Sequence, residues 1–260
     1  MPDSRPIAFF DSSLGGISVL RETVRLLPEE NYIYYGDSLH APYGINSPEE
    51  VLALSRAIVE RMLARQAKAI VIACNTATSA AAAALRAAYP EIPIIGTEPA
   101  LKPAVERHPG GRILVMATAM TVKEEKFQHL RRQYENDAEI IPIPCSGLME
   151  FVEQGILRGP QLGNYLFDKL SPYLKVPVDA VVLGCTHYAF LRGAIRQIVG
   201  RSPEILDGST GIAQQLRRRL EEAGTRNTAG TQGEVVFENS LEEPEILELS
   251  RALFHYEDEE

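Results

Sequence analysis

The sequence has few cysteines, no long hydrophobic run and no excess of basic residues. Its three cysteines are an odd number at wide spacing and form no CxxC pair, which argues against a disulfide framework and against a zinc site. No uninterrupted apolar run approaches the roughly 20 residues of a membrane span. The amino-terminal MPDSRPIAFF also lacks the basic and apolar regions of a secretory signal. These absences predict a cytoplasmic protein with reduced thiols and no membrane partner.

The charge balance limits the partners further. A net charge of −9 argues against nonspecific attraction to nucleic acid or to anionic membranes. It does not exclude a small acidic substrate, because the local field of a pocket can oppose the net charge. The turn SSLGG at 12–16 raises the alternative of a nucleotide site, but GxGxxG and GxxxxGK(S/T) are both absent, so that indication is weak.

Short apolar runs alternate with stretches of helical periodicity along the 260 residues. We expect buried parallel strands at 7–10, 31–36, 69–73, 92–96, 112–117, 139–144, 180–184 and 203–206. We expect helices at 48–66, 78–88, 122–134 and 211–223, the first capped by Ser47 and opened by Pro48. This alternation predicts an α/β fold with doubly wound parallel sheets, in which ligands lie beyond the carboxyl ends of the strands.

Two stretches repeat one pattern, which suggests internal duplication. KAIVIACNTATSAA at 68–81 and VDAVVLGCTHYAFLRGA at 178–194 both run from an apolar strand through a cysteine into a helix. We therefore predict two similar α/β domains with the active site in the cleft between them. The first would comprise 1–98 with 208–260, and the second 99–207. A loop is expected at 225–233, followed by a strand and a helix that return to the first domain.

The duplicated cysteines, Cys74 and Cys185, each stand where a strand leads into a helix. The partial positive charge of a helix N-terminus lowers the pKa of a thiol, so we expect accessible thiolates. The N–H groups of Asn75, Thr76, Thr186 and His187 could hold a carboxylate. Two opposed thiols suit the inversion of an amino acid, because one removes the α-proton and the other returns a proton to the opposite face.

Neighbouring polar residues could assist, although each has a simpler interpretation. Asp11 ends the first strand and His187 follows Cys185, so either could orient a thiol and relay its proton; Asp37 and Glu153 are further polar groups on expected loops or helix starts. Free cysteines are often merely buried, as we expect for the third, Cys145. Asp11 could instead be a turn residue or helix cap, and His187 a satisfied polar residue of a helix. The APYG segment could be a turn or the floor of a substrate pocket.

Four motifs carry a resemblance to a known family. FDSSLGGISVL, YYGDSLHAPYG, IVIACNTATS and VVLGCTHYAFL resemble the motifs of the cofactor-independent glutamate racemases, within the aspartate/glutamate racemase superfamily. The resemblance covers nearly the whole chain. It implies two α/β domains around one active site, commonly in a homodimer, and interconversion of L- and D-glutamate with no pyridoxal phosphate and no metal. D-glutamate would then serve bacterial peptidoglycan synthesis, and thereby cell wall biogenesis and cell shape.

The resemblance also assigns roles to residues. Cys74 and Cys185 match the two catalytic acid/base thiols, and Asp11 and His187 match the catalytic groups that assist them. The positions that match substrate-binding or neighbouring residues are Ser12, Asp37, Pro42, Tyr43, Gly44, Asn75, Thr76, Glu153 and Thr186. The chain departs from the family pattern at Ser13, where glycine is usual, at Ala189, where proline is usual, and at Leu39–His40, where a small residue and arginine are common.

Two rival interpretations stay open at this level. One is an aspartate or other amino-acid racemase of the same superfamily, because pocket length decides the substrate. The other is a ligand-binding relative that keeps the fold without turnover.

Overall fold

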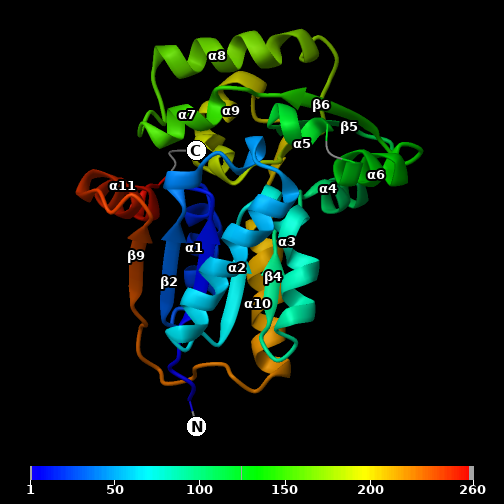
Figure 1. The fold of residues 1–260 in the computed structure, drawn as a ribbon. Helices are drawn as coiled ribbons and strands as arrows, with labels where there is room; N and C mark the ends of the chain where they lie inside the picture. Colours follow the sequence, from blue (N-terminus) through cyan, green and yellow to red (C-terminus); the bar gives the residue numbers. More distant parts are fainter. Residues whose placement is uncertain (1, 124, 258–260) are drawn as a thin grey trace. The chain divides into compact units, whose positions relative to one another are not determined.

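The computed structural model describes residues 2–123 and 125–257, and its contacts divide the chain into two compact units. The first unit comprises the chain up to Thr97 together with Ser209–His255, and the second comprises Glu98–Gly208 together with the described residues Tyr256 and Glu257. Each unit contains its own sheet of parallel strands with helices packed on it (Figure 1). The predicted α/β fold with two parallel sheets is therefore confirmed.

The sheet of the first unit has five strands in the order β4, β3, β1, β2, β9, and every neighbouring pair is parallel. In that order the strands are Ile94–Gly96, Ala69–Ile72, Ile7–Asp11, Tyr32–Gly36 and Val235–Asn239. β1, β2 and β3 are buried along their whole length, because helices cover both faces of the sheet. Asp11 pairs with Gly36 and Phe10 with Ile72, so the residues that follow these three strands meet at one edge.

The helices of this unit form two layers around the sheet. α2 (Pro48–Ala64) and α3 (Asn75–Ala88) pack against each other on one face. On the other face α1 (Ile17–Leu26) packs against α10 (Ser209–Glu222) and α11 (Pro244–His255) (Figure 1). Because α10, β9 and α11 come from the end of the chain, both terminal parts of the sequence build one unit.

The sheet of the second unit has four parallel strands in the order β6, β5, β7, β8. In that order the strands are Glu139–Pro144, Arg112–Ala117, Ala180–Leu183 and Glu204–Leu206. Its helices are α4 (Leu101–Arg107), α5 (Ala119–Lys123), α6 (Glu125–Tyr134), α7 (Leu148–Glu153), α8 (Pro160–Leu170) and α9 (Arg192–Val199), with short 3-10 helices η3 (Ser171–Tyr173) and η4 (Thr186–Leu191). α8 packs on α9, and α7 contacts η4.

All eight predicted strands are present, with ends displaced by at most two residues. The helix expected at 78–88 begins three residues earlier, because the Cys74 sulfur accepts a hydrogen bond from the Ala77 amide and caps the helix. The helix expected at 122–134 is instead two helices, α5 and α6, and residue 124 between them lies outside the described residues. The cap at Ser47 is confirmed, and Glu50 completes a capping box with it.

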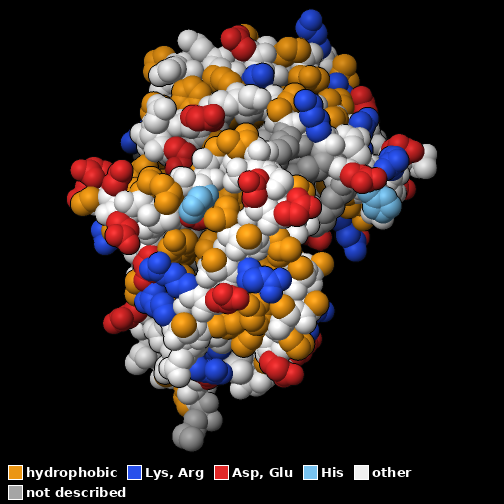
Figure 2. Space-filling model, in the orientation of Figure 1, with side chains coloured by type: hydrophobic (Ala, Val, Ile, Leu, Met, Phe, Trp, Pro, Cys, Tyr) orange, Lys and Arg blue, Asp and Glu red, His pale blue; other side chains and the backbone are white. Residues whose placement is uncertain are grey.

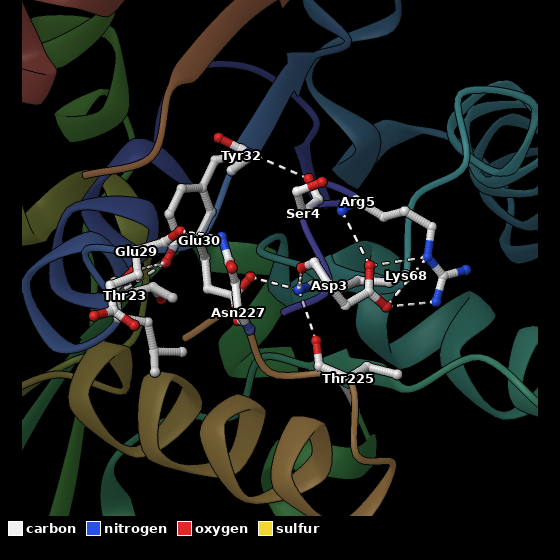
Figure 3. A network of polar contacts seen from close by, with 12 residues as sticks. Asp3, Ser4, Arg5, Thr23, Glu29, Glu30, Tyr32, Lys68, Thr225 and Asn227 are labelled. Carbon is white, nitrogen blue, oxygen red and sulfur yellow. Dashed lines mark hydrogen bonds and ion pairs between the residues drawn. The ribbon is translucent and has the colours of Figure 1, made fainter. Parts of the chain in front are cut away.

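A buried ion pair joins several chain segments at the amino ends of the strands in the first unit (Figure 3). Lys68 Nζ lies 2.6 Å from Glu30 Oε2, and both side chains are almost fully buried. The same ammonium donates to the carbonyls of Asp3 and Thr225 at 2.5 and 2.7 Å. Glu30 accepts a hydrogen bond from the Asn227 amide at 2.8 Å. The pair therefore holds the amino-terminal segment and the 225–233 loop against the starts of β2 and β3.

Charged side chains of both signs lie interspersed on the described surface that Figure 2 draws. No helix within the described residues is both long enough and apolar enough to cross a lipid bilayer.

Candidate active site

Cys74 lies at the carboxyl edge of the first sheet, between β3 and α3. Its sulfur accepts a hydrogen bond from the Ala77 amide at 3.4 Å and donates to Ser12 Oγ at 3.6 Å. Ser12 in turn donates to Asp11 Oδ1 at 3.0 Å. The residues expected at 11, 12 and 74 are thus brought together as a chain of hydrogen bonds that runs from the thiol to a buried carboxylate.

The position of Asp11 depends on a close approach of the turn before α1. A Cβ at Gly16 would lie 2.6 Å from the Ala73 Cβ and 2.9 Å from the Asp11 Cβ, so only glycine fits there. Asp11 Oδ1 also accepts a hydrogen bond from the Ser13 backbone amide at 3.1 Å. The N-cap of α1 is Gly16, so no side chain caps this helix. Asp11 therefore organises the turn and does not cap the helix. The φ angle of Ser13 is not positive, so its backbone does not require the glycine that is usual at this position in the resembling family.

The prediction that both thiols have lowered pKa values is wrong for Cys74. Burial, followed by the negative charge of Asp11, raises the pKa of the Cys74 thiol to about 12. Hydrogen bonding with Ala77 and Ser12 lowers the pKa of Cys74 but has a smaller effect. The unliganded protein therefore keeps Cys74 as a thiol at neutral pH, because desolvation outweighs the helix N-terminus.

A second polar group, built on Asp37, lies at the same sheet edge. Asp37 follows β2 directly, and its amide donates to the Asp11 carbonyl at 3.0 Å. Tyr43 Oη donates to Asp37 Oδ2 at 2.6 Å from η2 (Tyr43–Ile45). His40 Nδ1 lies 2.9 and 3.0 Å from the two carboxylate oxygens, at the end of η1 (Ser38–His40). Tyr43 is buried, with the more exposed Pro42 and Gly44 on either side of it.

Cys185 of the second unit has a different environment: its sulfur lies next to a histidine, and that histidine contacts a glutamate. Its sulfur lies 3.7 Å from His187 Nδ1, and His187 Nε2 lies 2.5 Å from Glu153 Oε1. Burial alone would lower the pKa of His187, but its hydrogen bonds to Cys185 and Glu153 together raise the pKa well above the usual value. Glu153 ends α7 and does not begin a helix, and its carboxylate contacts the imidazole of His187.

The remaining expected residues stand in the first turns after the cysteines. Asn75 and Thr76 open α3 and Thr186 opens η4, all three half-buried. Backbone N–H groups in a first helical turn have no partner within the helix, which makes them suitable anion ligands. Cys145 is buried and donates to the Ile143 carbonyl at 3.4 Å.

Sequence reasoning missed one hydroxyl pair in the second unit. Thr118 follows β5, the neighbour of β7, and its Oγ1 lies 2.9 Å from Thr121 Oγ1. The Gly184 amide just before Cys185 bonds to the Met116 carbonyl, so these strand ends lie side by side. The signal was the position of ATAMT directly after a predicted strand, at the edge where ligands bind.

Comparison with known proteins identifies the family of this chain. The family described as Asp/Glu/Hydantoin racemase matches residues 11–216. This chain belongs to the Asp/Glu/Hydantoin racemase family. The matched range of this racemase-family chain begins at Asp11 and includes both Cys74 and Cys185.

Curated relatives match this family member over nearly their whole length. A glutamate racemase of Clostridium perfringens (strain SM101 / Type A) is 52% identical over 248 residues, which is 95% of each chain. A glutamate racemase of Clostridium botulinum (strain Alaska E43 / Type E3) is 48% identical, covering 96% of this chain and 97% of the relative.

Solved structures agree with the sequence relatives. Escherichia coli glutamate racemase, in complex with L-glutamate and the activator UDP-MurNAc-ala, aligns with a TM-score of 0.85 and 30% identity, covering 96% of this chain and 95% of that one. Francisella tularensis glutamate racemase, in complex with D-glutamate, gives a TM-score of 0.81 and 25% identity, covering 98% and 95%.

Proposed function

We propose that this chain is a glutamate racemase in which Cys74 and Cys185 exchange protons with opposite faces of the α-carbon. The observation that carries the substrate assignment is the 52% identity to a curated glutamate racemase over 95% of both chains. The observation that carries the mechanism is that each cysteine follows a parallel strand and has its own polar relay: Ser12 and Asp11 for Cys74, His187 and Glu153 for Cys185.

On the Cys74 side, the direction of the hydrogen bonds defines how the sulfur becomes a base. The thiol donates to Ser12 Oγ and Ser12 donates to Asp11, so a proton can pass along this chain from sulfur to carboxylate. The thiolate then forms an S–H bond with the α-proton, and the electron pair of the C–H bond stays on the α-carbon. A substrate ammonium near the site would favour this ionisation, because a positive charge lowers the pKa that burial and Asp11 raise.

On the Cys185 side, the imidazole governs the proton of the opposing sulfur. The Cys185 thiol gives its proton to the carbanion from the other face, and the configuration inverts. A protonated His187 then stabilises the resulting thiolate from 3.7 Å, while Glu153 keeps the ring oriented and charged. In the reverse direction the two cysteines exchange roles, as a reversible racemase requires.

The substrate carboxylates have suitable ligands in both units. The first-turn amides of Asn75, Thr76 and Thr186 suit the anionic groups, and Ser12 and the Pro42–Gly44 segment complete the expected substrate wall in the first unit. We expect no pyridoxal phosphate and no metal to be needed, since the thiols supply both the base and the acid.

The deciding experiment has two measurements, both with no cofactor added. One is the incorporation of solvent deuterium into each enantiomer of glutamate, and the other is the change of configuration by circular dichroism. Wild-type protein is expected to racemise both enantiomers. Cys74→Ala and Cys185→Ala are each expected to abolish racemisation, while Cys145→Ala remains active as a control. Full racemisation by either alanine variant would contradict the two-cysteine mechanism. Faster turnover of aspartate than glutamate would favour the sister racemase, and binding without deuterium exchange would favour a non-catalytic relative.

We further propose that the product, D-glutamate, enters peptidoglycan synthesis in the cytoplasm and that the protein is a homodimer. The three free cysteines suit a reducing compartment. Growth of a D-glutamate auxotroph expressing this chain tests the cellular role, and sedimentation equilibrium tests the dimer. No growth without added D-glutamate, or a monomer at micromolar concentration, would contradict the respective proposal.

A further inference from the structure

The side chain of His40 holds a buried carboxylate that the proton-transfer steps do not use. The Asp37 side chain is only 3% exposed, whereas that of His40 is 44% exposed. His40 Nδ1 lies 2.9 and 3.0 Å from the two oxygens of Asp37. A carboxylate only accepts hydrogen bonds, so Nδ1 carries the hydrogen and donates it to Asp37. The imidazole therefore covers the carboxylate from the solvent side.

Asp37 is held from its other side by a group of the expected substrate wall. Tyr43 Oη donates to Asp37 Oδ2 at 2.6 Å, and its ring is fully buried. Burial and the hydrogen bond to Asp37 raise the pKa of Tyr43 far above its usual value, so the phenol keeps the hydrogen that it donates. Since a buried carboxylate needs hydrogen-bond partners, His40 and Tyr43 are coupled through Asp37.

Tyr43 connects this group to the catalytic thiol. It belongs to the same buried cluster as Cys74, and η2 contacts α3, which begins after Cys74. The charges of Cys74 and Asp11 also act on the Tyr43 phenol, which places it near both groups. Because Tyr43 lies in the middle of the Pro42–Gly44 segment, its hydrogen bond to Asp37 also restrains the backbone of that segment against α3.

We propose that His40 is a positioning residue of this racemase: by donating to Asp37 it fixes Tyr43 and the Pro42–Gly44 wall next to Cys74. This inference rests on the proposed function and adds to it a residue that has no part in proton transfer. It predicts a selective effect on substrate binding. Loss of an interaction that acts equally on bound substrate and transition state raises KM and leaves kcat nearly unchanged.

Three substitutions at one position test the geometry. The Nδ2 atom of asparagine occupies the place of the histidine Nδ1, because both are separated from Cα by Cβ and Cγ. The Nε2 atom of glutamine lies one bond further out. His40→Ala is expected to raise KM for both enantiomers by about three- to tenfold, the effect of one hydrogen bond. His40→Asn is expected to restore the wild-type KM and His40→Gln is not, with kcat within about twofold throughout.

A double-mutant cycle with Tyr43→Phe tests the route of the effect. Tyr43→Phe removes the donor to Asp37, so adding His40→Ala to it is expected to change KM by less than twofold. His129→Ala on α6, an exposed imidazole, is the control and is expected to keep the wild-type KM. Thermal melting of each variant separates misfolding from weakened binding. The Asn and Gln variants, which share the same amide group, carry the test if the alanine variant is unstable.

The outcomes distinguish this inference from the proposed function. Wild-type protein that does not racemise glutamate would overturn both. Active wild type with an unchanged KM in His40→Ala, a loss in kcat instead of KM, equal KM values for the Asn and Gln variants, or additive effects with Tyr43→Phe would overturn the role of His40 alone.

Discussion

Glu153 and His187 form a hydrogen bond of 2.5 Å on the ring edge opposite Cys185. Glu153 is contributed by the end of α7 and His187 by η4, two elements that pack together in the second unit. The carboxylate and the sulfur together overcome the desolvation of the buried ring and raise the pKa of His187. The charged state of the imidazole is therefore a property of three side chains, and each can be tested.

Glu153→Gln is expected to shift the alkaline limb of the pH profile. The amide keeps a hydrogen-bond acceptor but removes the charge that raises the pKa of His187. His187 then loses its proton at lower pH, so kcat/KM should begin to fall at lower pH than in wild type. The measurement is kcat/KM for both enantiomers between pH 6 and 10, with Glu150→Gln on the same helix as control. An unchanged alkaline limb would mean that Glu153 does not set the charge of His187.

Asp11→Asn is expected to separate thiol reactivity from catalysis. The negative charge of Asp11 raises the pKa of Cys74, so its removal lowers that pKa and increases the thiolate fraction. Mass spectrometry should therefore detect faster alkylation of Cys74 by iodoacetamide at pH 8, although racemisation decreases because the proton acceptor is lost. Cys145, which is also buried, serves as the internal reference. Slower alkylation of Cys74 would contradict the sign of this effect.

Lys68→Met is expected to destabilise the protein strongly. It leaves the buried Glu30 carboxylate without its cation, and breaking a buried pair costs about 3–5 kcal/mol. Lys102→Met, which breaks the exposed pair with Glu106, is the control and should change little. Urea unfolding at pH 7 measures both. Adding Glu30→Gln to Lys68→Met should recover part of the loss, whereas additive losses would show that the two side chains act independently.

Gly16→Ala is expected to reduce both stability and activity. The new methyl group would meet the Cβ atoms of Ala73 and Asp11, and such overpacking costs about 1–3 kcal/mol. Because Asp11 must move, racemisation should fall more than the loss of folded protein explains. Gly163→Ala in α8 is the matched control: its added Cβ meets nothing within 4 Å, and alanine favours the helix. Thermal melting and activity at 25 °C measure both variants, and equal behaviour would refute the steric argument.

The sequence by itself determined the parallel strands, some of the helices between them and the position of a cysteine after β3 and after β7. Those features depend on apolar runs and capping residues that are neighbours along the chain, such as Ser47 and Glu50. Tertiary structure alone decided which distant residues meet: Glu153 with His187, Lys68 with Glu30, and the Gly184 amide with the Met116 carbonyl. It also decided the pKa of Cys74, because the helix N-terminus is visible in the sequence whereas the desolvation that outweighs it arises only when the core closes around the sulfur.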